Sequence, residues 1–283
     1  MEHVAPILFN RAQLRKRRGR MGQRFVNHDF LWREATERVE ESLALITHRF
    51  PTVVGFGTHA MEKPAGTAHF IHCADSAGWP QPHQLVADEE FLPFAENSVD
   101  AVVSILSLQW VNDLPGALAQ IQRMLKPDGL FMAILPGGET LRELRSIFAE
   151  AESAISGGIT PRISPFIDVR DGGALLQRAG FALPVADTEL LSISYPNLFA
   201  LMDDVRGSGS ANVLQQRVQH FTPRGFFLEA AARYGEQFAD AQGRITATME
   251  LVTLTAWKPS ANQQQPAKRG SGSLSLRDAL KGA

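Results

Sequence analysis

The chain has 283 residues, 44% of them hydrophobic and 20% charged, which is enough apolar sequence for a globular core. Its formal net charge is −2, so the fold as a whole is not built to bind nucleic acid. A single cysteine excludes an internal disulfide and fits a reducing compartment, and we expect neither a signal peptide nor a membrane span, which needs ~18 apolar residues in a row.

The first element in chain order is a run of basic residues from Arg11 to Arg20 (RAQLRKRRGR). One interpretation is a patch for RNA or anionic lipid, which would allow peripheral association with a membrane. A second is the remnant of a transit peptide. We favour the solvated face of an N-terminal helix, because Ala12 and Leu14 give such a helix something to pack. With another helix predicted over Val26–Phe50, residues 1–50 form an N-terminal helical segment.

Short apolar runs then alternate with loops and one clear helix. The helix is Leu114–Leu125, where apolar residues recur at helical spacing, and it ends at the turn Lys126–Gly129 (KPDG). Near-continuous apolar strands joined by crossovers predict a parallel sheet that is covered on both faces. The five predicted strands are Thr52–Gly57, Ala68–Ala74, His83–Ala87, Val99–Leu106 and Leu130–Leu135.

The second half of the chain adds helices and two more strands. In the stretch GGETLRELRSIFAEAESA (Gly137–Ala154), a helix is predicted from the N-cap Thr140 to about Ala154, with Glu143 completing a capping box. A helical insertion over residues 197–240 precedes the last strand, so the main domain spans residues 51–259. The tail, residues 260–283, is polar and disordered by composition alone. The remaining elements are a helix over Gly172–Gly180, a strand over Phe181–Pro196 with a bend at Pro184, and a strand over Arg244–Pro259.

Candidate binding residues gather where the first two strands end. In an open parallel sheet, ligands bind at the carboxyl ends of the strands, near the point where the strand order reverses. Gly55 and Gly57 follow the first strand and allow a ligand to approach closely, although a strand turn often needs glycine without one. Asp75 ends the second strand, where it is placed to accept two ribose hydroxyls or, alternatively, to cap a turn.

Polar residues also follow the third and fourth strands. Asp88 and Glu89 are placed to accept from an adenine amino group, or else form a solvated acidic turn. Gln109 and Trp110 offer a polar tip and an apolar plane, although Trp110 is equally suited to the core and Asp113 to a helix cap. The strand-end register that these positions share makes a single binding edge the favoured interpretation.

Other chemistries find little support. The sequence lacks the Gly-x-Ser-x-Gly elbow of common hydrolases and the P-loop, and its histidines do not have zinc-site spacing. His72 and Asp75 are close in sequence, but alternate residues of a strand point to opposite faces, so we expect no metal pair there. We expect Cys73 to be a small buried apolar residue, and no catalytic residue is identified.

Three stretches resemble the class I methyltransferases that use S-adenosylmethionine. They are VVGFGTHA (Val53–Ala60), FLPFAENSVDAVVS (Phe91–Ser104) and RMLKPDGLFMAIL (Arg123–Leu135). The resemblance implies an α/β fold whose doubly wound, seven-stranded sheet is mostly parallel, with N-terminal helices and a helical insertion before the last strand.

The same resemblance implies a site for S-adenosylmethionine. It implies Asp75 at the ribose and Asp88 at the adenine end, and the full predicted cofactor set is Gly55, Gly57, Asp75, Asp88, Glu89 and Leu106. The chain departs from the family at Val53, where an acid is usual, and at His59, where a third glycine is usual. We therefore expect the cofactor to bind, but more weakly than is usual for the family.

A narrower resemblance covers nearly the whole chain. Segments such as LSLQWVNDLPGAL (Leu106–Leu118), LPGGETLRELR (Leu135–Arg145) and YPNLFALMDDVRGSGSANV (Tyr195–Val213) resemble the family of complex I assembly factors described as arginine hydroxylases. One departure is Gln109, where that family is expected to have His; Gln-Trp here is similar to the malonyl-carrier-protein methyltransferases of biotin synthesis. The predicted substrate-binding set is Gln109, Trp110, Gly138, Glu139 and Arg142.

Three functions therefore stay open. The first is an enzyme that hydroxylates or methylates an arginine of a complex I subunit, located in the bacterial cytoplasm or the mitochondrial matrix. The second is a carboxyl methyltransferase that acts on a small molecule or carrier protein. The third is a chaperone without catalysis, in which the altered glycine loop no longer binds the cofactor and the helical insertion grips an assembling subunit.

Overall fold

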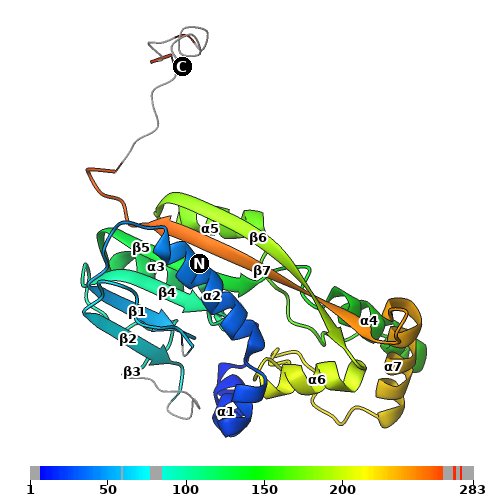
Figure 1. The fold of residues 1–283 in the computed structure, drawn as a ribbon. Helices are drawn as coiled ribbons and strands as arrows, with labels where there is room; N and C mark the ends of the chain where they lie inside the picture. Colours follow the sequence, from blue (N-terminus) through cyan, green and yellow to red (C-terminus); the bar gives the residue numbers. More distant parts are fainter. Residues whose placement is uncertain (1–6, 59, 77–84, 264–269, 272–274, 276–283) are drawn as a thin grey trace.

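The computed structural model describes residues 7–58, 60–76, 85–263, 270–271 and 275. Its strands form one seven-stranded sheet in the order β3-β2-β1-β4-β5-β7-β6 (Figure 1). The first five strands are parallel, whereas β7 runs antiparallel to both β5 and β6. The expected α/β fold with a mostly parallel, seven-stranded sheet is confirmed. The strands are β1 (Thr52–Phe56), β2 (His69–Ala74), β3 (Leu85–Val86), β4 (Val99–Ile105), β5 (Leu125–Pro136), β6 (Ala182–Tyr195) and β7 (Ile245–Trp257).

Helices cover both faces of the sheet, as the apolar strands require. In β5, Phe131 and Ala133 pack on one face and Met132 and Ile134 on the other, because alternate residues of a strand point to opposite sides. The helices α3 and α5 cover the first face and α2 the second (Figure 1). The helices are α1 (Arg11–Met21), α2 (Phe30–Ala44), α3 (Leu114–Met124), α4 (Arg142–Ser156), α5 (Val169–Arg178), α6 (Leu198–Gly207) and α7 (Arg224–Phe238), with short 3-10 turns η1 (Gly22–Asn27) and η2 (Leu108–Trp110).

Strands β6 and β7 extend past the rest of the sheet. Strand β5 pairs with β7 over Leu251–Trp257, while Ile245–Glu250 pairs with β6 alone. The resulting two-stranded ribbon leads to α4, α6 and α7, which share a separate apolar cluster that includes Phe148, Leu201 and Tyr234 (Figure 1). We call these three helices the lobe. Helices α6 and α7 and the loop between them lie within residues 197–240, before the last strand.

Helix α1 is fixed at its start. Asn112 accepts hydrogen bonds from the backbone N–H groups of Leu8 (2.8 Å) and Phe9 (2.7 Å). Phe9 and Leu14 pack with Trp110, and the same small cluster contains Val213 and Leu214 from the loop between α6 and α7. The N-terminal helix is therefore docked onto both the strand-end loop after β4 and the helical insertion.

Two local predictions were wrong. Thr140 does not cap α4: the cap position is Leu141 with φ +53°, and Thr140 Oγ1 instead donates to the carbonyl of Glu250. Glu143 accepts from the backbone and hydroxyl of Thr248 on β7, so it fastens the helix to the sheet rather than closing a capping box.

The third predicted strand, His83–Ala87, is seen only as Leu85–Val86, since its first two residues lie outside the described ranges.

The other expectations fared better. The bend in β6 is present, where the pairing with β7 shifts between Ala182 and Val185 and Leu183 has φ +49°. Asp113 caps α3 by accepting from the N–H of Gly116 at 2.9 Å, which was one of its two interpretations. The KPDG turn opens β5, with Asp128 at φ +63°.

None of the helices among the described residues is long and apolar enough to cross a membrane.

Candidate functional site

The ends of β1, β2 and β4 surround a small hollow at the point where the strand order reverses. Strand β1 lies between β2 and β4, so the loops that follow these strands meet at one edge. The hollow has a volume of about 10 Å³. Its lining residues are Arg18, Trp32, Gly57, Cys73, Ala74, Asp75, Leu106 and Ser107. Three of the predicted cofactor residues, Gly57, Asp75 and Leu106, are therefore brought together.

The loop after β1 needs its glycines for the turn itself. Gly57 has φ +67°, and a Cβ there would lie 1.9 Å from the backbone oxygen of Ile105. A Cβ on Gly55 would lie 2.3 Å from Oγ1 of Thr58. Both glycines thus have a structural reason that does not require a ligand, which was the alternative weighed from the sequence. The neighbouring His59 lies outside the described residues.

Asp75 is buried and already paired. Its Oδ2 accepts from Nη1 of Arg18 at 2.6 Å, and the two side chains are 2% and 5% exposed. Its other oxygen, Oδ1, is buried and has no hydrogen-bond partner among the described residues. A buried carboxylate oxygen without a donor is costly, so this atom is available to a hydroxyl or amide that enters the hollow.

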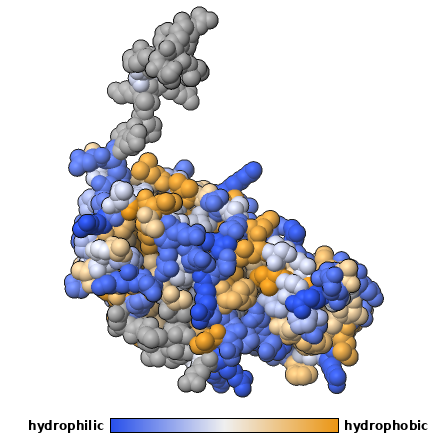
Figure 2. All heavy atoms as spheres, in the orientation of Figure 1, coloured by the Kyte–Doolittle hydropathy of each residue, from blue (hydrophilic) through white to orange (hydrophobic). Residues whose placement is uncertain are grey.

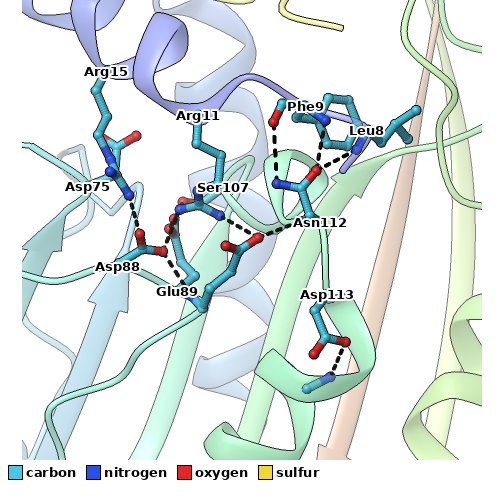
Figure 3. Close-up of polar contacts among 12 residues, drawn as sticks. Leu8, Phe9, Arg11, Arg15, Asp75, Asp88, Glu89, Ser107, Asn112 and Asp113 are labelled. Atoms are coloured by element: carbon cyan, nitrogen blue, oxygen red, sulfur yellow. Dashed lines mark hydrogen bonds and ion pairs between the residues drawn. The ribbon is translucent and has the colours of Figure 1, made fainter. Parts of the chain in front are cut away.

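Asp88 and Glu89 are paired with the same helix (Figure 3). Arg11 contacts Asp88 at 2.9 Å and Glu89 at 2.5 Å, and Arg15 also bonds Asp88. Ser107 donates its hydroxyl to the second oxygen of Glu89. Burial acts to lower the pKa of Arg11, but the charges of Glu89 and Asp88 outweigh it and raise the pKa overall. We call Asp75, Asp88 and Glu89 the acidic edge.

The expectation that Arg11–Arg20 presents a solvated helix face was wrong for one side of α1. Arg11, Arg15 and Arg18 recur at intervals of four and three residues, which places them on one helix face. That face meets the acidic edge, and Arg11 and Arg18 are buried there. The opposite pattern holds for Lys16 and Arg20, which are exposed.

The acidic edge offers polar groups that suit a nucleoside cofactor, but the hollow beside it has a small volume. The unpartnered oxygen of Asp75, beside the loop that contains Gly57, suits a ribose hydroxyl. Pockets for ligands of that size measure about 300–1,000 Å³, however, and the hollow measures about 10 Å³. The hollow alone is therefore too small for S-adenosylmethionine, and the arginines of α1 occupy carboxylate oxygens of the acidic edge.

A much larger cavity lies beside the hollow, between α1, α2 and the lobe. Its volume is about 350 Å³, and Trp32 and Leu106 line both spaces. Most of its wall is apolar, from side chains such as Phe30, Phe148 and Met202. Figure 2 shows apolar surface in the region between the sheet and the lobe, as well as further apolar patches on the same face. A space of this size and lining is suited to a substrate side chain.

Two residues of the predicted substrate set line this cavity. Trp110 is 4% exposed and packs edge-on against Phe9 at 5.7 Å between ring centroids, so it is also a core residue. Gln109 donates from Nε2 to the carbonyl of Leu106 at 2.8 Å. Its Oε1 is buried without a partner among the described residues.

The other three residues of that set lie elsewhere. Glu139 and Arg142 form an ion pair of 2.9 Å, and each is more than half exposed. A Cβ on Gly138 would meet nothing within 4 Å. None of the three lines the large cavity, whereas Thr140 and Leu141 from the same segment do.

One carboxylate, Asp204, lines the cavity among the described residues. Its Oδ2 accepts from the hydroxyl of Tyr195 at 2.7 Å, and its Oδ1 lies 2.8 Å from Nδ1 of His28. Because a carboxylate only accepts, Nδ1 of His28 carries the proton. Burial, reinforced by Asp204, raises the pKa of Tyr195, so the phenol stays neutral and donates. The carboxylate is therefore held in one orientation from two sides.

Three arginines on the cavity wall, Arg17, Arg206 and Arg217, have no carboxylate partner within 4 Å in the part of the chain that the structure describes, and Arg206 is the exposed one of the three. Arg17 donates to the carbonyl of Asn212 at 2.6 Å, and Arg217 to that of Leu214 at 3.0 Å. Burial, together with the charge of Arg217, lowers the pKa of Arg17. A fourth arginine on the wall, Arg162, is neutralised by Glu152 at 2.7 Å.

Metal and thiol chemistry gain no support from the described residues. No group of three or more His, Cys, Asp or Glu side chains among them is arranged to hold a metal ion. His72 bonds Thr58 rather than Asp75. Cys73 is buried, and burial together with Glu89 raises its pKa to about 12, so the thiol stays protonated.

Several residues of the site were missed from the sequence. The spacing of Arg11, Arg15 and Arg18 places them on one helix face, but this pattern alone does not distinguish a paired face from a solvated one. His28, Tyr195 and Asp204 come from three separate elements, and no local pattern links them.

Comparison with known proteins supports the architecture. A family model described as a methyltransferase domain matches residues 66–133. Among solved structures, the YcgJ protein of Bacillus subtilis aligns with a TM-score of 0.52 at 12% identity, over 81% of this chain and 99% of that one. At that identity the likeness shows a shared fold alone.

Curated relatives are more similar in sequence. A Danio rerio protein described as "Arginine-hydroxylase NDUFAF5, mitochondrial" is 39% identical over 267 residues, covering 90% of this chain and 83% of that protein. The Homo sapiens protein of the same description is 47% identical over 192 residues, covering 68% of this chain and 55% of that one. A malonyl-[acyl-carrier protein] O-methyltransferase of Xylella fastidiosa is 34% identical over 272 residues and 90% of both chains.

Proposed function

The chain belongs to the methyltransferase-fold family that contains the arginine-hydroxylase NDUFAF5 proteins, and from this membership we propose that it is an enzyme that modifies an arginine side chain of a protein substrate during assembly of respiratory complex I. The substrate is a complex I subunit, and the enzyme works where such subunits are assembled: the bacterial cytoplasm or the mitochondrial matrix. S-adenosylmethionine is its proposed cofactor, bound at the acidic edge once that edge is open.

The observation that carries the proposal is Asp204 in the large cavity. An arginine side chain has a long apolar stem and a planar, always charged head. The apolar wall suits the stem, and the carboxylate of Asp204, fixed by Tyr195 and His28, suits the guanidinium. The cavity adjoins the hollow at Trp32 and Leu106, so an arginine bound there would face the acidic edge.

The residues of the chain bind and orient the arginine in this proposal. Asp204 holds the head, Tyr195 and His28 hold Asp204, and the apolar wall excludes water from the stem. Whether the group added to the arginine is a methyl group or an oxygen is decided by the mass of the product.

The test is replacement of Asp204 by Asn in a strain deleted for the gene. With the unmodified chain restored, one arginine-containing peptide of complex I gains the mass of an oxygen or of a methylene group. We expect Asp204→Asn to lose that modification, because an amide cannot neutralise the guanidinium. Asp203→Asn changes the exposed neighbour and should leave the modification intact. A modification that persists in Asp204→Asn would contradict the assignment of the cavity.

A second candidate is carboxyl methylation of a malonyl carrier protein. It is favoured by the relative from Xylella fastidiosa and by the unneutralised pair Arg17 and Arg217, which suits a carboxylate. Incubation of the purified protein with malonyl carrier protein and S-adenosylmethionine tests it directly. A methyl ester on the malonyl group would establish this activity, and its absence at high enzyme concentration would exclude it.

A further inference from the structure

We propose that Arg17 and Arg217 bind a carboxylate of the substrate, so that the modified arginine lies near an acidic residue in the substrate sequence. This inference rests on the proposed function, in which the arginine itself occupies the cavity at Asp204. It adds the sequence class of the substrate: a segment with an arginine and a nearby Asp or Glu.

The first step of the argument is position. Arg17 comes from α1 and Arg217 from the loop between α6 and α7, and both line the cavity that contains Asp204. Each is partly buried and held by a backbone carbonyl, so both guanidinium groups have fixed positions on the wall.

The second step is charge. Two guanidinium groups that sense one another in a partly buried space repel, and the lowered pKa of Arg17 reflects both its burial and Arg217. Carbonyl groups satisfy donors but do not neutralise charge. Arg162, on the same wall, has Glu152 for that purpose, whereas Arg17 and Arg217 have no such partner in the described chain. An incoming carboxylate would supply the missing charge and accept from both groups.

The third step is complementarity. The cavity wall carries one carboxylate, Asp204, among the described residues, and its partly buried arginines without a carboxylate partner are Arg17 and Arg217. A segment with only an arginine would satisfy Asp204 and leave the arginine pair uncompensated. A segment with both charges satisfies Asp204 and the arginine pair.

The experiment uses capped peptides that contain one arginine and a glutamate one, two or three positions away, with matched peptides in which glutamine replaces the glutamate. Calorimetry on the full chain gives their affinities. We expect the best glutamate peptide to bind at least tenfold more tightly than its glutamine match. Arg17→Gln and Arg217→Gln should remove that preference, and Arg20→Gln, an exposed residue of the same helix, should retain it. Arg217→Lys keeps the charge and should retain part of it.

The outcomes separate this inference from the proposed function. Equal binding of glutamate and glutamine peptides, or a preference that survives in both Arg17→Gln and Arg217→Gln, overturns the carboxylate site. Peptides with citrulline in place of arginine test Asp204 separately. If peptide affinity depends on the arginine but not on the glutamate, only the carboxylate site is overturned. If it depends on the glutamate but not on the arginine, only the assignment of Asp204 is overturned. Failure of every peptide to bind counts against both.

A different observation carries a second inference. We infer that α1 is a gate, whose arginines leave the acidic edge before the cofactor enters. Arg18 holds Asp75 and Arg11 holds Glu89 in buried pairs, and the remaining hollow of about 10 Å³ is too small for a nucleoside. The inference rests on the proposed cofactor.

The movement is one of arginine side chains and not of the whole helix. Leu8 and Phe9 are fixed to Asn112, and Leu14 is packed with Trp110, Val213 and Leu214. Contact with the acidic edge is made by arginine side chains, which can exchange one acceptor for another. The unpartnered Oδ1 of Asp75 is the atom that a ribose hydroxyl would reach first.

The gate is tested by calorimetric titration with S-adenosylmethionine of the full chain, of Arg18→Met and of the exposed control Arg20→Met. We expect Arg18→Met to bind at least tenfold more tightly than the parent and Arg20→Met to match the parent. In the unmodified chain, trypsin should cut within α1 faster when the cofactor is present, which gives a readout that does not depend on folding of the variant.

Equal or weaker binding by Arg18→Met, or slower cleavage of α1 with the cofactor, overturns the gate and leaves the cofactor site standing. Binding by neither protein overturns the cofactor proposal and the gate together.

Discussion

Arg18 and Asp75 lie 57 positions apart in sequence, yet their side chains form a 2.6 Å ion pair that is almost completely shielded from solvent. A buried pair is held by the mutual attraction of two charges that have each lost their water, so neither partner tolerates loss of the other. This one contact joins the basic N-terminal helix to the strand end at which the sequence places a ligand.

Breaking this pair should be strongly destabilising. We expect Arg18→Met to lower the free energy of unfolding by about 3–5 kcal/mol, because it leaves the Asp75 charge buried without a partner. The double variant Arg18→Met with Asp75→Asn should recover most of that loss. Urea denaturation of the parent and three variants measures the coupling. Additive losses would show that the two side chains do not interact in solution.

The turn after β1 should reject any side chain at Gly57. We expect Gly57→Ala to be destabilised by more than the ~1–2 kcal/mol of a left-handed alanine, because its Cβ also meets the Ile105 carbonyl at 1.9 Å. Gly138→Ala, with open space around its Cβ, is the matched control and should change stability by about 0.5 kcal/mol or less. Thermal unfolding compares the two. Similar melting temperatures would contradict the described turn.

Glu143 should make stability depend on pH below the ordinary range of a glutamate. Burial acts to raise its pKa, but hydrogen bonds from Thr248 outweigh burial and hold the pKa below the usual value of about 4.3. The unfolded chain therefore binds the proton first, so this contribution is complete above about pH 4.3 and is lost as the pH falls through the folded-state pKa.

Glu143→Gln should remove that part of the acid dependence. It should also lower stability near neutral pH by about 1–3 kcal/mol, since an amide cannot accept both Thr248 bonds. Urea denaturation across the acid range gives both effects. An unchanged slope of stability against pH in the variant would contradict the assignment.

Asn112 should control how firmly the N-terminus is docked. Asn112→Ala removes the acceptor of the Leu8 and Phe9 amides, at about 1 kcal/mol for each bond. Hydrogen exchange of residues 8–21 should accelerate, while that of the sheet stays slow. Asp113→Ala is the control: it weakens the cap of α3 by about 1 kcal/mol and should leave the N-terminal amides protected. Equal exchange in both variants would show that Asn112 is not the anchor.

The sheet could be predicted from the sequence because its strands are continuous apolar runs. Phe131–Ile134 are buried on both faces, and a short apolar run that follows a turn such as KPDG is typical of a strand in a covered parallel sheet. The gathering of Asp75, Asp88 and Glu89 at one edge also followed from strand order alone. Their role as cofactor ligands stays a prediction.

The arginine partners of Asp75, Asp88 and Glu89 could not be predicted in the same way. The contacts from Arg11 to Glu89 and from Arg18 to Asp75 span 78 and 57 positions. A local reading of Arg11–Arg20 sees only charge, which is typical of a solvated face. The predicted cap at Thr140 was wrong for a related reason. The Thr140 hydroxyl bonds to β7, a strand that begins more than 100 residues later. Local propensity gave way to tertiary hydrogen bonds in both cases.

The outer ends of β6 and β7 form a two-stranded ribbon that connects the lobe to the rest of the sheet. Over Ile245–Glu250 the β7 strand has β6 as its single neighbour in the sheet, and paired strands without further neighbours twist more freely than a full sheet. Tyr195 sits at the tip of this ribbon, and Asp204 follows on α6. Twisting of this ribbon would move Asp204 relative to the strand-end edge, and the bond from His28 and the packing of Val213 and Leu214 on the N-terminal helix oppose that movement.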